Sequence, residues 1–174
     1  MTPAQQSALE ALIGRGLGAG ELTTLDPLVT ARNDIAIADA LSAGRTRIAE
    51  RRVSELGVRK SLGVVDASRL LSALKDSAAA ADAGIVEPWL SAVLVAMGVP
   101  VADHPAYQET VGSAWRWLTQ PEGLDIGANA ARSMLDLIAA GIPGLAATCA
   151  TVKAMAETAD PVPIRDVSAA LNEA

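Results

Sequence analysis

The chain has 174 residues, of which 51% are hydrophobic, but only four are aromatic: three Trp, one Tyr and no Phe. Its 36 alanines indicate a core built from small side chains. A chain of this length buries roughly 70% of its unfolded surface, so it can fold without disulfides or a metal. The net charge of −6 argues against a general nucleic-acid binder, because such proteins gain affinity by neutralising phosphates.

Neither a secretory nor a membrane-spanning segment is expected. The single cysteine, Cys149, cannot form an intrachain disulfide, which fits a reducing cytosol. The N-terminus lacks the basic and apolar regions of a signal peptide. The most apolar stretch, Trp89–Ala102, is too short to cross a bilayer and contains Gly98 and Pro100. We therefore expect synthesis in a bacterial-type cytoplasm and no membrane partner.

Helix signals follow one another along the first half of the chain. Thr2 and Gln5 form a capping box around Pro3, which predicts a helix to about Ile13. The glycines of residues 14–20 end that helix, and the next is expected from Asn33 or Asp34 to Gly44. Residues 45–53 hold too few apolar side chains for a helical stripe and are predicted to be extended or irregular.

In the rest of the chain, capping residues, glycines and prolines again indicate where helices begin and end. Further helices are predicted over residues 54–62, 66–84, 87–98, 103–118, 125–141, 143–156 and 164–171. With a count of seven or eight short helices and no convincing strand pair, the sequence predicts an all-α irregular bundle without a substantial sheet. We expect a single domain over residues 1–174, with any subdomain boundary near residues 98–104.

Two tryptophans flank one predicted apolar stripe. In the helix over residues 103–118, the stripe consists of Tyr107, Val111, Ala114 and Leu118. Trp115 and Trp117 fall about 80° to either side of it. We assign Trp115 to packing. For Trp117, contact with an intramolecular groove and a place in an interface remain equally good interpretations.

The motifs that could carry enzyme chemistry all have simpler explanations. The glycine run contains G-x-G-x-x-A, but it follows a helix instead of a strand, so a linker is favoured over a dinucleotide loop. Ser72 and Lys75 match S-x-x-K without the other motifs of that enzyme class, which favours a solvated helix face. Glu122 and Asp125 precede a helix, where carboxylates cap free N–H groups.

His104 and Cys149 are the remaining candidates for metal binding or nucleophilic catalysis. Two residues do not complete a metal site, and Cys149 lies on an apolar stripe, where a buried and inert thiol is usual. We therefore predict no catalytic residue, no cofactor and no metal, and a protein that is not an enzyme.

The clearest candidate for partner binding is a basic segment, residues 45–60. It carries six bases against two acids, a local net charge of +4 within an acidic chain. A solvated surface loop is the alternative interpretation. The partner-binding candidates are Arg45, Arg47, Arg51, Arg52, Arg59, Lys60 and Trp117.

Three stretches together resemble a family of small, uncharacterised helical proteins of tailed bacteriophages and prophages, encoded among virion and tail genes. They are Asn33–Ile48 (NDIAIADALSAGRTRI), Gly123–Ile142 (GLDIGANAARSMLDLIAAGI) and Asp160–Ala174 (DPVPIRDVSAALNEA). The match is weaker over residues 49–120. The family offers no active site to carry over, so the resemblance implies a non-enzymatic phage protein that forms part of the particle or helps to build it.

The residues and the resemblance together lead to one functional expectation. We expect a virion- or tail-associated protein that binds other phage structural proteins or itself, located in the virion and without nucleic-acid contacts. The alternative is a phage accessory protein that binds and inhibits a host factor. A third hypothesis is a small enzyme that uses Cys149 or Ser72.

Overall fold

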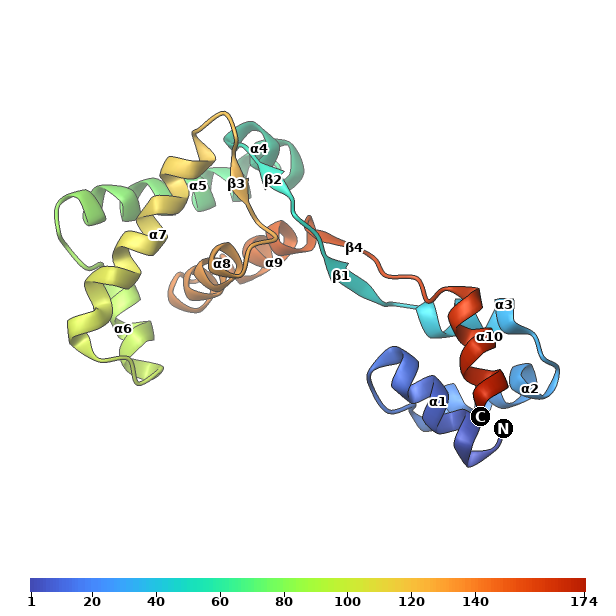
Figure 1. Cartoon of the computed structure of the whole chain (residues 1–174). Helices are drawn as coiled ribbons and strands as arrows, with labels where there is room; N and C mark the ends of the chain where they lie inside the picture. Colours follow the sequence, from blue (N-terminus) through green and yellow to red (C-terminus); the bar gives the residue numbers. More distant parts are fainter. The chain divides into compact units, whose positions relative to one another are not determined.

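The computed structural model describes residues 1–174 and is predominantly α-helical, which confirms the predicted fold class. It contains ten α-helices, one 3₁₀ turn and two small two-stranded sheets (Figure 1). The predicted count of seven or eight helices was too low, because all nine ranges with helix signals are helical. The helix that the sequence did not predict is α2 (Ala19–Thr30), which follows the glycine run.

The chain forms two compact units, and the second is inserted into the first. Unit 1 comprises residues 1–47 and 158–174, and unit 2 comprises residues 48–157. The turn at 98–104, where a subdomain boundary was considered, lies within unit 2. Two short strands, β1 (Thr46–Ile48) and β4 (Glu157–Ala159), pair at the points where the chain passes from one unit to the other.

Unit 1 brings the two ends of the chain into one small core. Besides α2 it contains α1 (Pro3–Ile13), α3 (Asp34–Ser42) and α10 (Ile164–Glu173). The C-terminal α10 packs on α1 and α3 through the buried Val167 and Leu171. The helix starts follow local signals: Thr2 forms the predicted capping box, and Asn33 caps α3 by accepting from the N–H of Ala36.

The turn between α1 and α2 is ordered by one carboxylate. Gly14 ends α1 in the left-handed conformation, with φ +70°. Glu21 accepts the N–H of Gly18 at the start of α2, at 2.8 Å, and also receives the guanidinium of Arg15 at 2.6 Å. These hydrogen bonds, from Arg15 first and then from Gly18, lower the pKa of Glu21 to about 2. The glycine run is therefore a turn between two helices. At the start of α2, the carboxylate of Glu21 accepts a backbone N–H, whereas a dinucleotide-binding loop would hold a phosphate at its helix start.

Unit 2 is built around two long helices that cross closely. Its elements are β2 (Arg52–Val53), α4 (Glu55–Leu62), α5 (Val64–Asp82), α6 (Pro88–Ala96), the 3₁₀ turn η1 (Val101–Asp103), α7 (His104–Leu118), β3 (Leu124–Asp125), α8 (Asn129–Gly141) and α9 (Ala146–Ala154). Ser54 caps α4 as predicted, by accepting the N–H of Gly57. Residues 45–53 form the short strands β1 and β2 with irregular backbone between them, in agreement with the predicted extended or irregular segment. Strand β2 pairs with β3 in antiparallel register.

Helices α5 and α7 approach to backbone contact at Gly112. A Cβ atom on Gly112 would lie 2.9 Å from the Cβ of Ala81 and 3.1 Å from the Cα of Ala78. The buried side of α7 also differs from the predicted stripe, because Tyr107 is exposed and Gln108 takes the buried position. Gln108 can do so since its amide is satisfied by hydrogen bonds to α5 and to Glu87.

We expect Gly112→Ala to lower the free energy of unfolding of unit 2. Forcing a methyl group against the backbone of α5 costs about 1–3 kcal/mol, which exceeds the gain of up to about 1 kcal/mol in helix propensity. All three tryptophans lie in unit 2, so urea unfolding followed by tryptophan fluorescence reports on this unit. Gly57→Ala is the matched control, because its nearest neighbour would be 3.7 Å away, and it should leave stability equal or higher. Equal effects of the two substitutions would contradict the close crossing.

The folded chain should lose stability in acid as Glu21 becomes protonated. The pKa of Glu21 is about 2 in the folded chain and near 4.5 when the chain is unfolded. The Glu21 carboxylate therefore stabilises the folded state fully above pH 4.5, and this stabilisation is lost as the pH falls towards 2. In an NMR titration of the side-chain carboxyl carbon, Arg15→Ala should move the Glu21 midpoint upward. Arg165→Ala, a change at another exposed arginine of unit 1, should not move it. A midpoint that is the same with and without Arg15 would show that the ion pair is not formed.

Candidate interaction surface

Trp117 is the one tryptophan that the fold leaves largely outside the core. It lies in the last turn of α7 with 43% of its surface exposed, whereas Trp115 and Trp89 pack partly buried against the core of unit 2. The prediction that Trp115 serves packing is thus confirmed. Trp117 stays available for contacts.

A groove of about 390 Å³ lies beside Trp117. Its walls come from the end of α7, the turn that leads into β3, and the start of α8, and Arg52 of β2 closes one side. The lining residues are Arg52, Trp117, Gln120, Glu122, Gly123, Leu124, Asp125, Ala128, Ala130 and Ala131. Three of these are alanines, whose short side chains leave the space unfilled. Two residues that the sequence analysis selected for separate reasons, Arg52 and Trp117, therefore line one groove.

The pairing of β2 with β3 is what brings Arg52 to this groove. In the antiparallel register Arg52 lies opposite Asp125, and Val53 lies opposite Leu124. Gly123 has φ +74°, and a Cβ there would lie 2.6 Å from the carbonyl oxygen of Val53, so only glycine allows the two strands to meet this closely. Asp125 accepts the backbone N–H groups of Arg51 and Gly127, both at 3.0 Å, and so joins the turn to β2. The prediction that Glu122 and Asp125 cap the following helix was wrong, because Ala128 precedes α8 and no side chain caps that helix.

A second hollow, of about 450 Å³, continues the surface toward α4. It shares Gln120 with the groove and is lined in addition by Leu56 and Arg59 of α4. Leu56 is an exposed large apolar side chain. We call the two hollows together, with Arg52, Leu56, Arg59, Trp117 and Gln120, the Trp117 face.

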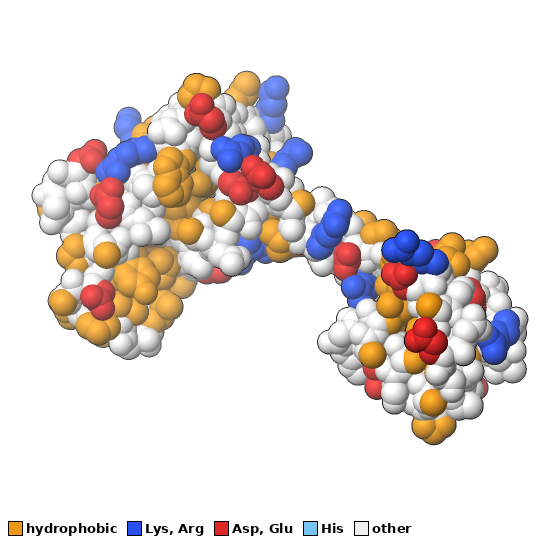
Figure 2. Space-filling view, viewed as in Figure 1, with side chains coloured by type: hydrophobic (Ala, Val, Ile, Leu, Met, Phe, Trp, Pro, Cys, Tyr) orange, Lys and Arg blue, Asp and Glu red, His pale blue; other side chains and the backbone are white.

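The charges on this face are largely compensated. Arg52 pairs with Glu50 at 3.0 Å, and Arg59 pairs with Glu55 at 2.7 Å. The hydrogen bond from Glu50 raises the pKa of Arg52, and the carboxylates of Asp125 and Glu122 add to this effect. Acidic and basic side chains are interspersed over unit 2 (Figure 2). The local charge of +4 along residues 45–60 already includes Glu50 and Glu55, and Asp125 and Glu122 near Arg52 reduce it further in the folded protein.

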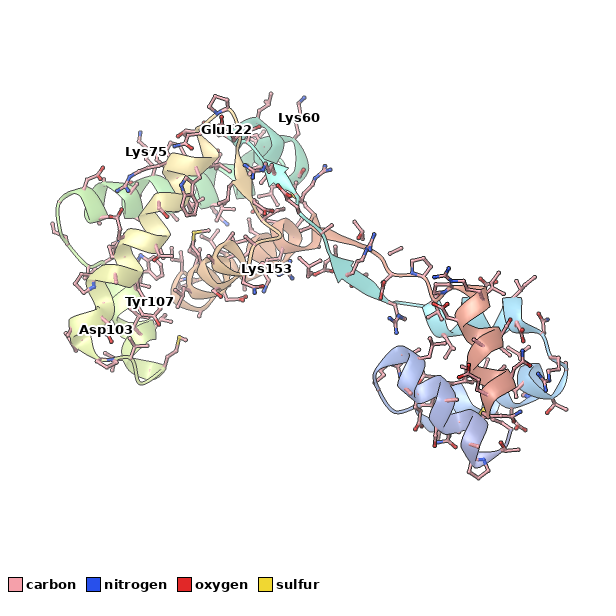
Figure 3. All side chains as sticks on the ribbon, viewed as in Figure 1. Lys60, Lys75, Asp103, Tyr107, Glu122 and Lys153 are labelled. Carbon is pink, nitrogen blue, oxygen red and sulfur yellow. The ribbon has the colours of Figure 1, made fainter.

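The other bases of the segment are placed differently. Arg45 belongs to unit 1, where it pairs with Asp160 at 2.7 Å and donates to the carbonyl of Ile13, so local structure accounts for it. Arg47 is also in unit 1 and is exposed. Arg51 and Lys60 of unit 2 are exposed without an ion pair, and Lys60 projects from α4 (Figure 3).

The candidate nucleophiles are not assembled into a site. His104 is buried and bonds to Ser91 and to the carbonyl of Val99, each at 3.2 Å, and it has no hydrogen bond to Cys149. Cys149 is buried in the core, and this desolvation raises the pKa of its thiol to about 11. Ser72 and Lys75 are both exposed on α5 with no hydrogen bond between them.

No further class of site is evident. No cluster of three or more His, Cys, Asp or Glu side chains is arranged to hold a metal ion. None of the helices is both long enough and apolar enough to cross a lipid bilayer. Comparisons with protein families, with curated proteins and with solved structures gave no match to the chain.

The other residues that line the groove at Trp117 could not be predicted from the sequence. Leu124, Ala128 and Ala131 give no signal of their own, because small and apolar residues are frequent throughout the chain. The strand pairing that gathers them joins segments more than 70 residues apart. A two-residue strand carries too short a pattern to be detected from sequence.

We expect Cys149 to be unreactive in the folded protein. With a thiol pKa of about 11, it holds almost no thiolate at pH 8, and its burial also blocks reagents. Ellman's reagent should therefore label one thiol per chain in urea and essentially none in buffer. Rapid labelling of the native protein at pH 8 would show that the thiol is accessible and would revive it as a nucleophile.

Proposed function

We propose that this chain is a non-enzymatic, virion- or tail-associated phage protein that acts by binding other phage proteins through the Trp117 face. The observation that carries the choice of surface is the exposed Trp117 ring beside a groove of about 390 Å³. The phage assignment is supported by the resemblance of the three sequence stretches.

The composition of the Trp117 face fits a protein-binding surface. Tryptophan and arginine are the residue types most enriched among interface positions that dominate binding energy. Here Trp117 and three alanines line one groove together with Arg52, and Arg59 lines the neighbouring hollow. Arg52 and Arg59 are in ion pairs with Glu50 and Glu55. An apolar centre with a polar rim is the usual anatomy of an interface.

The resemblance and the groove also coincide in the chain. The stretch Gly123–Ile142 supplies β3 and α8, and thus most of the groove wall, including Leu124, Asp125 and Ala131. The stretches Asn33–Ile48 and Asp160–Ala174 lie largely in unit 1 and form α3 and α10. The segment that resembles phage proteins in unit 2 is therefore the one that builds the surface to which we assign binding.

Location in the particle is the direct test. Mass spectrometry of purified particles from a phage or prophage that encodes the chain should find it in stoichiometric amounts. Its absence from complete particles would overturn the virion assignment and favour an accessory protein that binds a host factor.

Truncating the ring should weaken partner binding without unfolding the chain. A photocrosslinking amino acid at Gln120, at the groove edge, should capture a phage protein in cells that assemble particles. Trp117→Ala should reduce the yield at least tenfold, since truncating a dominant interface residue costs about 2 kcal/mol or more. The double reversal Arg51→Glu and Arg52→Glu should also reduce it, with a change in unfolding free energy below about 1 kcal/mol.

Matched controls separate binding from folding. Ile35→Ala removes an apolar side chain of α3 in unit 1 that is more exposed than Trp117, and Lys75→Glu reverses an exposed charge on α5. Neither should change the yield of crosslinked product. An undiminished yield with Trp117→Ala would exclude the Trp117 face as the binding surface.

A further inference from the structure

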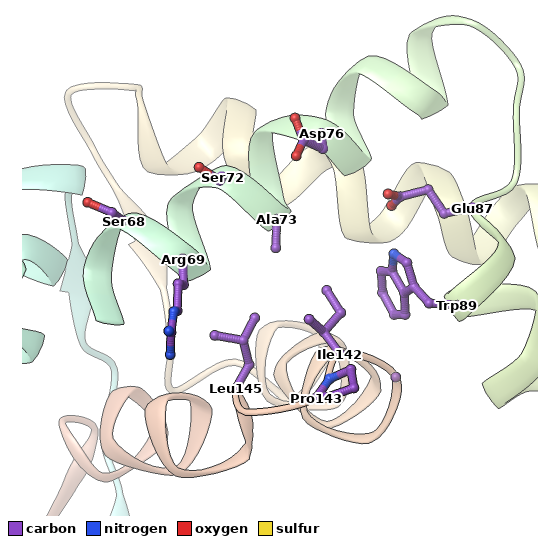
Figure 4. A pocket seen from close by; sticks show the side chains of 11 residues that line it. Ser68, Arg69, Ser72, Ala73, Asp76, Glu87, Trp89, Ile142, Pro143 and Leu145 are labelled. Atoms are coloured by element: carbon purple, nitrogen blue, oxygen red, sulfur yellow. The ribbon is translucent and has the colours of Figure 1, made fainter. Parts of the chain in front are cut away.

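A cavity of about 590 Å³ lies in unit 2 and shares no lining residue with the groove at Trp117. It opens between α5, the start of α6 and the turn that joins α8 to α9 (Figure 4). This volume falls in the range of pockets that bind small molecules or single side chains of a partner. None of its charged residues belongs to the partner-binding candidates drawn from the sequence.

The walls at the centre of the cavity are apolar. Ala73 of α5 faces Ile142, Pro143 and Leu145 of the α8–α9 turn, and Trp89 stands at one end (Figure 4). The indole ring of Trp89 packs against α8. A Cβ on Gly141 would lie only 2.3 Å from its Cε3 atom, so α8 and the ring are in direct contact. The ring therefore forms a rigid aromatic surface at that end.

A carboxylate beside Trp89 is oriented by two fully buried side chains. Oε2 of Glu87 accepts hydrogen bonds from the hydroxyl of Ser77 and from Nε2 of Gln108, and these two residues are each only 1% exposed. Oε1 of Gln108 in turn accepts the backbone N–H of Glu87 at 2.9 Å. The remaining oxygen of Glu87, Oε1, receives no hydrogen bond from the protein. The fold thus fixes one carboxylate oxygen and leaves the other for a ligand.

The charges at the two ends of the cavity are opposite. Asp76 of α5 lines the Glu87 end and has no ion pair, so two carboxylates serve that end. Arg69, beside Leu145, lines the other end and has no carboxylate partner (Figure 4). Asp76 follows Arg69 by seven positions in α5, which is about 10 Å along the helix axis. A ligand that fits has a cation at one end, an aliphatic middle and a hydrogen-bond acceptor at the other end.

We propose that this cavity binds an alkylammonium or guanidinium cation carried on an aliphatic stem, as in a lysine or arginine side chain of a partner polypeptide. The cation lies between Glu87 and the face of Trp89, and the stem runs over Ile142 and Leu145. Arg69 receives the main-chain carbonyl of the partner. A free alkyl amine offers the same cation and stem but no carbonyl.

Other ligand chemistries fit less well. A neutral apolar group would strip water from Oε1 of Glu87 without replacing its hydrogen bonds, which costs free energy. An anion at that end would face both Glu87 and Asp76. A cation gains from both carboxylates and from the electron-rich face of tryptophan, the best of the aromatic side chains for this contact.

This proposal does not depend on the function of the Trp117 face. The two sites share no lining residue, so each can be tested with the other removed. Trp117→Ala should leave binding of a cation in the cavity unchanged.

The test is an NMR titration of the full ¹⁵N-labelled chain with three probes. They are acetyl-Ala-Lys-Ala-amide, the same peptide with norleucine in place of lysine, and n-butylammonium. The lysine peptide should shift the indole N–H of Trp89 and the amide of Gly141 saturably at millimolar concentrations. The norleucine peptide, which keeps the four-carbon stem but lacks the ammonium group, should bind about fivefold more weakly.

Two substitutions locate the cation. Glu87→Gln retains an oxygen that can accept from Ser77 and Gln108, so it should preserve the fold while lowering the affinity for the lysine peptide about fivefold. Asp76→Asn, at an exposed position, should lower it by a smaller factor and serves if Glu87→Gln unfolds. The control Glu109→Gln removes an exposed carboxylate of α7 outside the cavity and should have no effect.

The outcomes separate the sources of the cation. Tighter binding of the lysine peptide than of n-butylammonium supports a polypeptide side chain held also by Arg69. Equal binding supports a free alkyl amine. Equal affinities for the lysine and norleucine peptides, or no shift at Trp89 with any probe, would overturn the proposal.

Discussion

The contact between α5 and α7 at Gly112 determines most of the arrangement of unit 2. Because glycine brings the two backbones together, Gln108, one turn earlier on the same buried side of α7, can reach the carbonyl of Ser77 on α5 at 2.9 Å. The same amide side chain receives the N–H of Glu87 and so sets where α6 begins. From there Trp89 projects against Gly141 of α8. The close approach at Gly112 thus allows a series of contacts among α5, α7, α6 and α8, which ends at the cavity lined by Trp89.

Small side chains have opposite effects inside and at the surface. In the core, alanine and glycine let helices pack closely, as at Ala78 and Ala81 against α7. At the surface they leave hollows, and two of these hollows are lined by a tryptophan: the groove at Trp117 and the cavity at Trp89. In a chain with four aromatic residues, each ring has a large effect on its surroundings. Both proposed binding sites therefore contain one of the few large rings of the chain.

The features that could be predicted from sequence are those made by neighbours in the chain. The capping box at Thr2 and the cap at Ser54 each involve residues within one helical turn, and both form as expected. The missed helix α2 begins at Ala19, after the N-cap residue Gly18. The N–H of Gly18 donates to the carboxylate of Glu21, and a glycine at the N-cap gives no helix-start signal in the sequence. The joining of both chain ends in unit 1 depends on contacts such as Arg45 with Asp160, 115 residues apart. No local pattern encodes such a pairing, because it depends on which surfaces remain after the helices have formed.

The same reasoning applies to the charge of the basic segment, residues 45–60. Counting charges along residues 45–60 included Glu50 and Glu55, but Glu122 and Asp125 reach Arg52 only through the pairing of β2 with β3. With its bases compensated, the Trp117 face cannot attract a partner over long distances as a charged patch does. Ion pairs at the rim still exclude partners that present the wrong charges. Under our proposal, recognition at the Trp117 face depends on the fit of an apolar group beside the ring of Trp117, and the charges act on orientation once the surfaces have met.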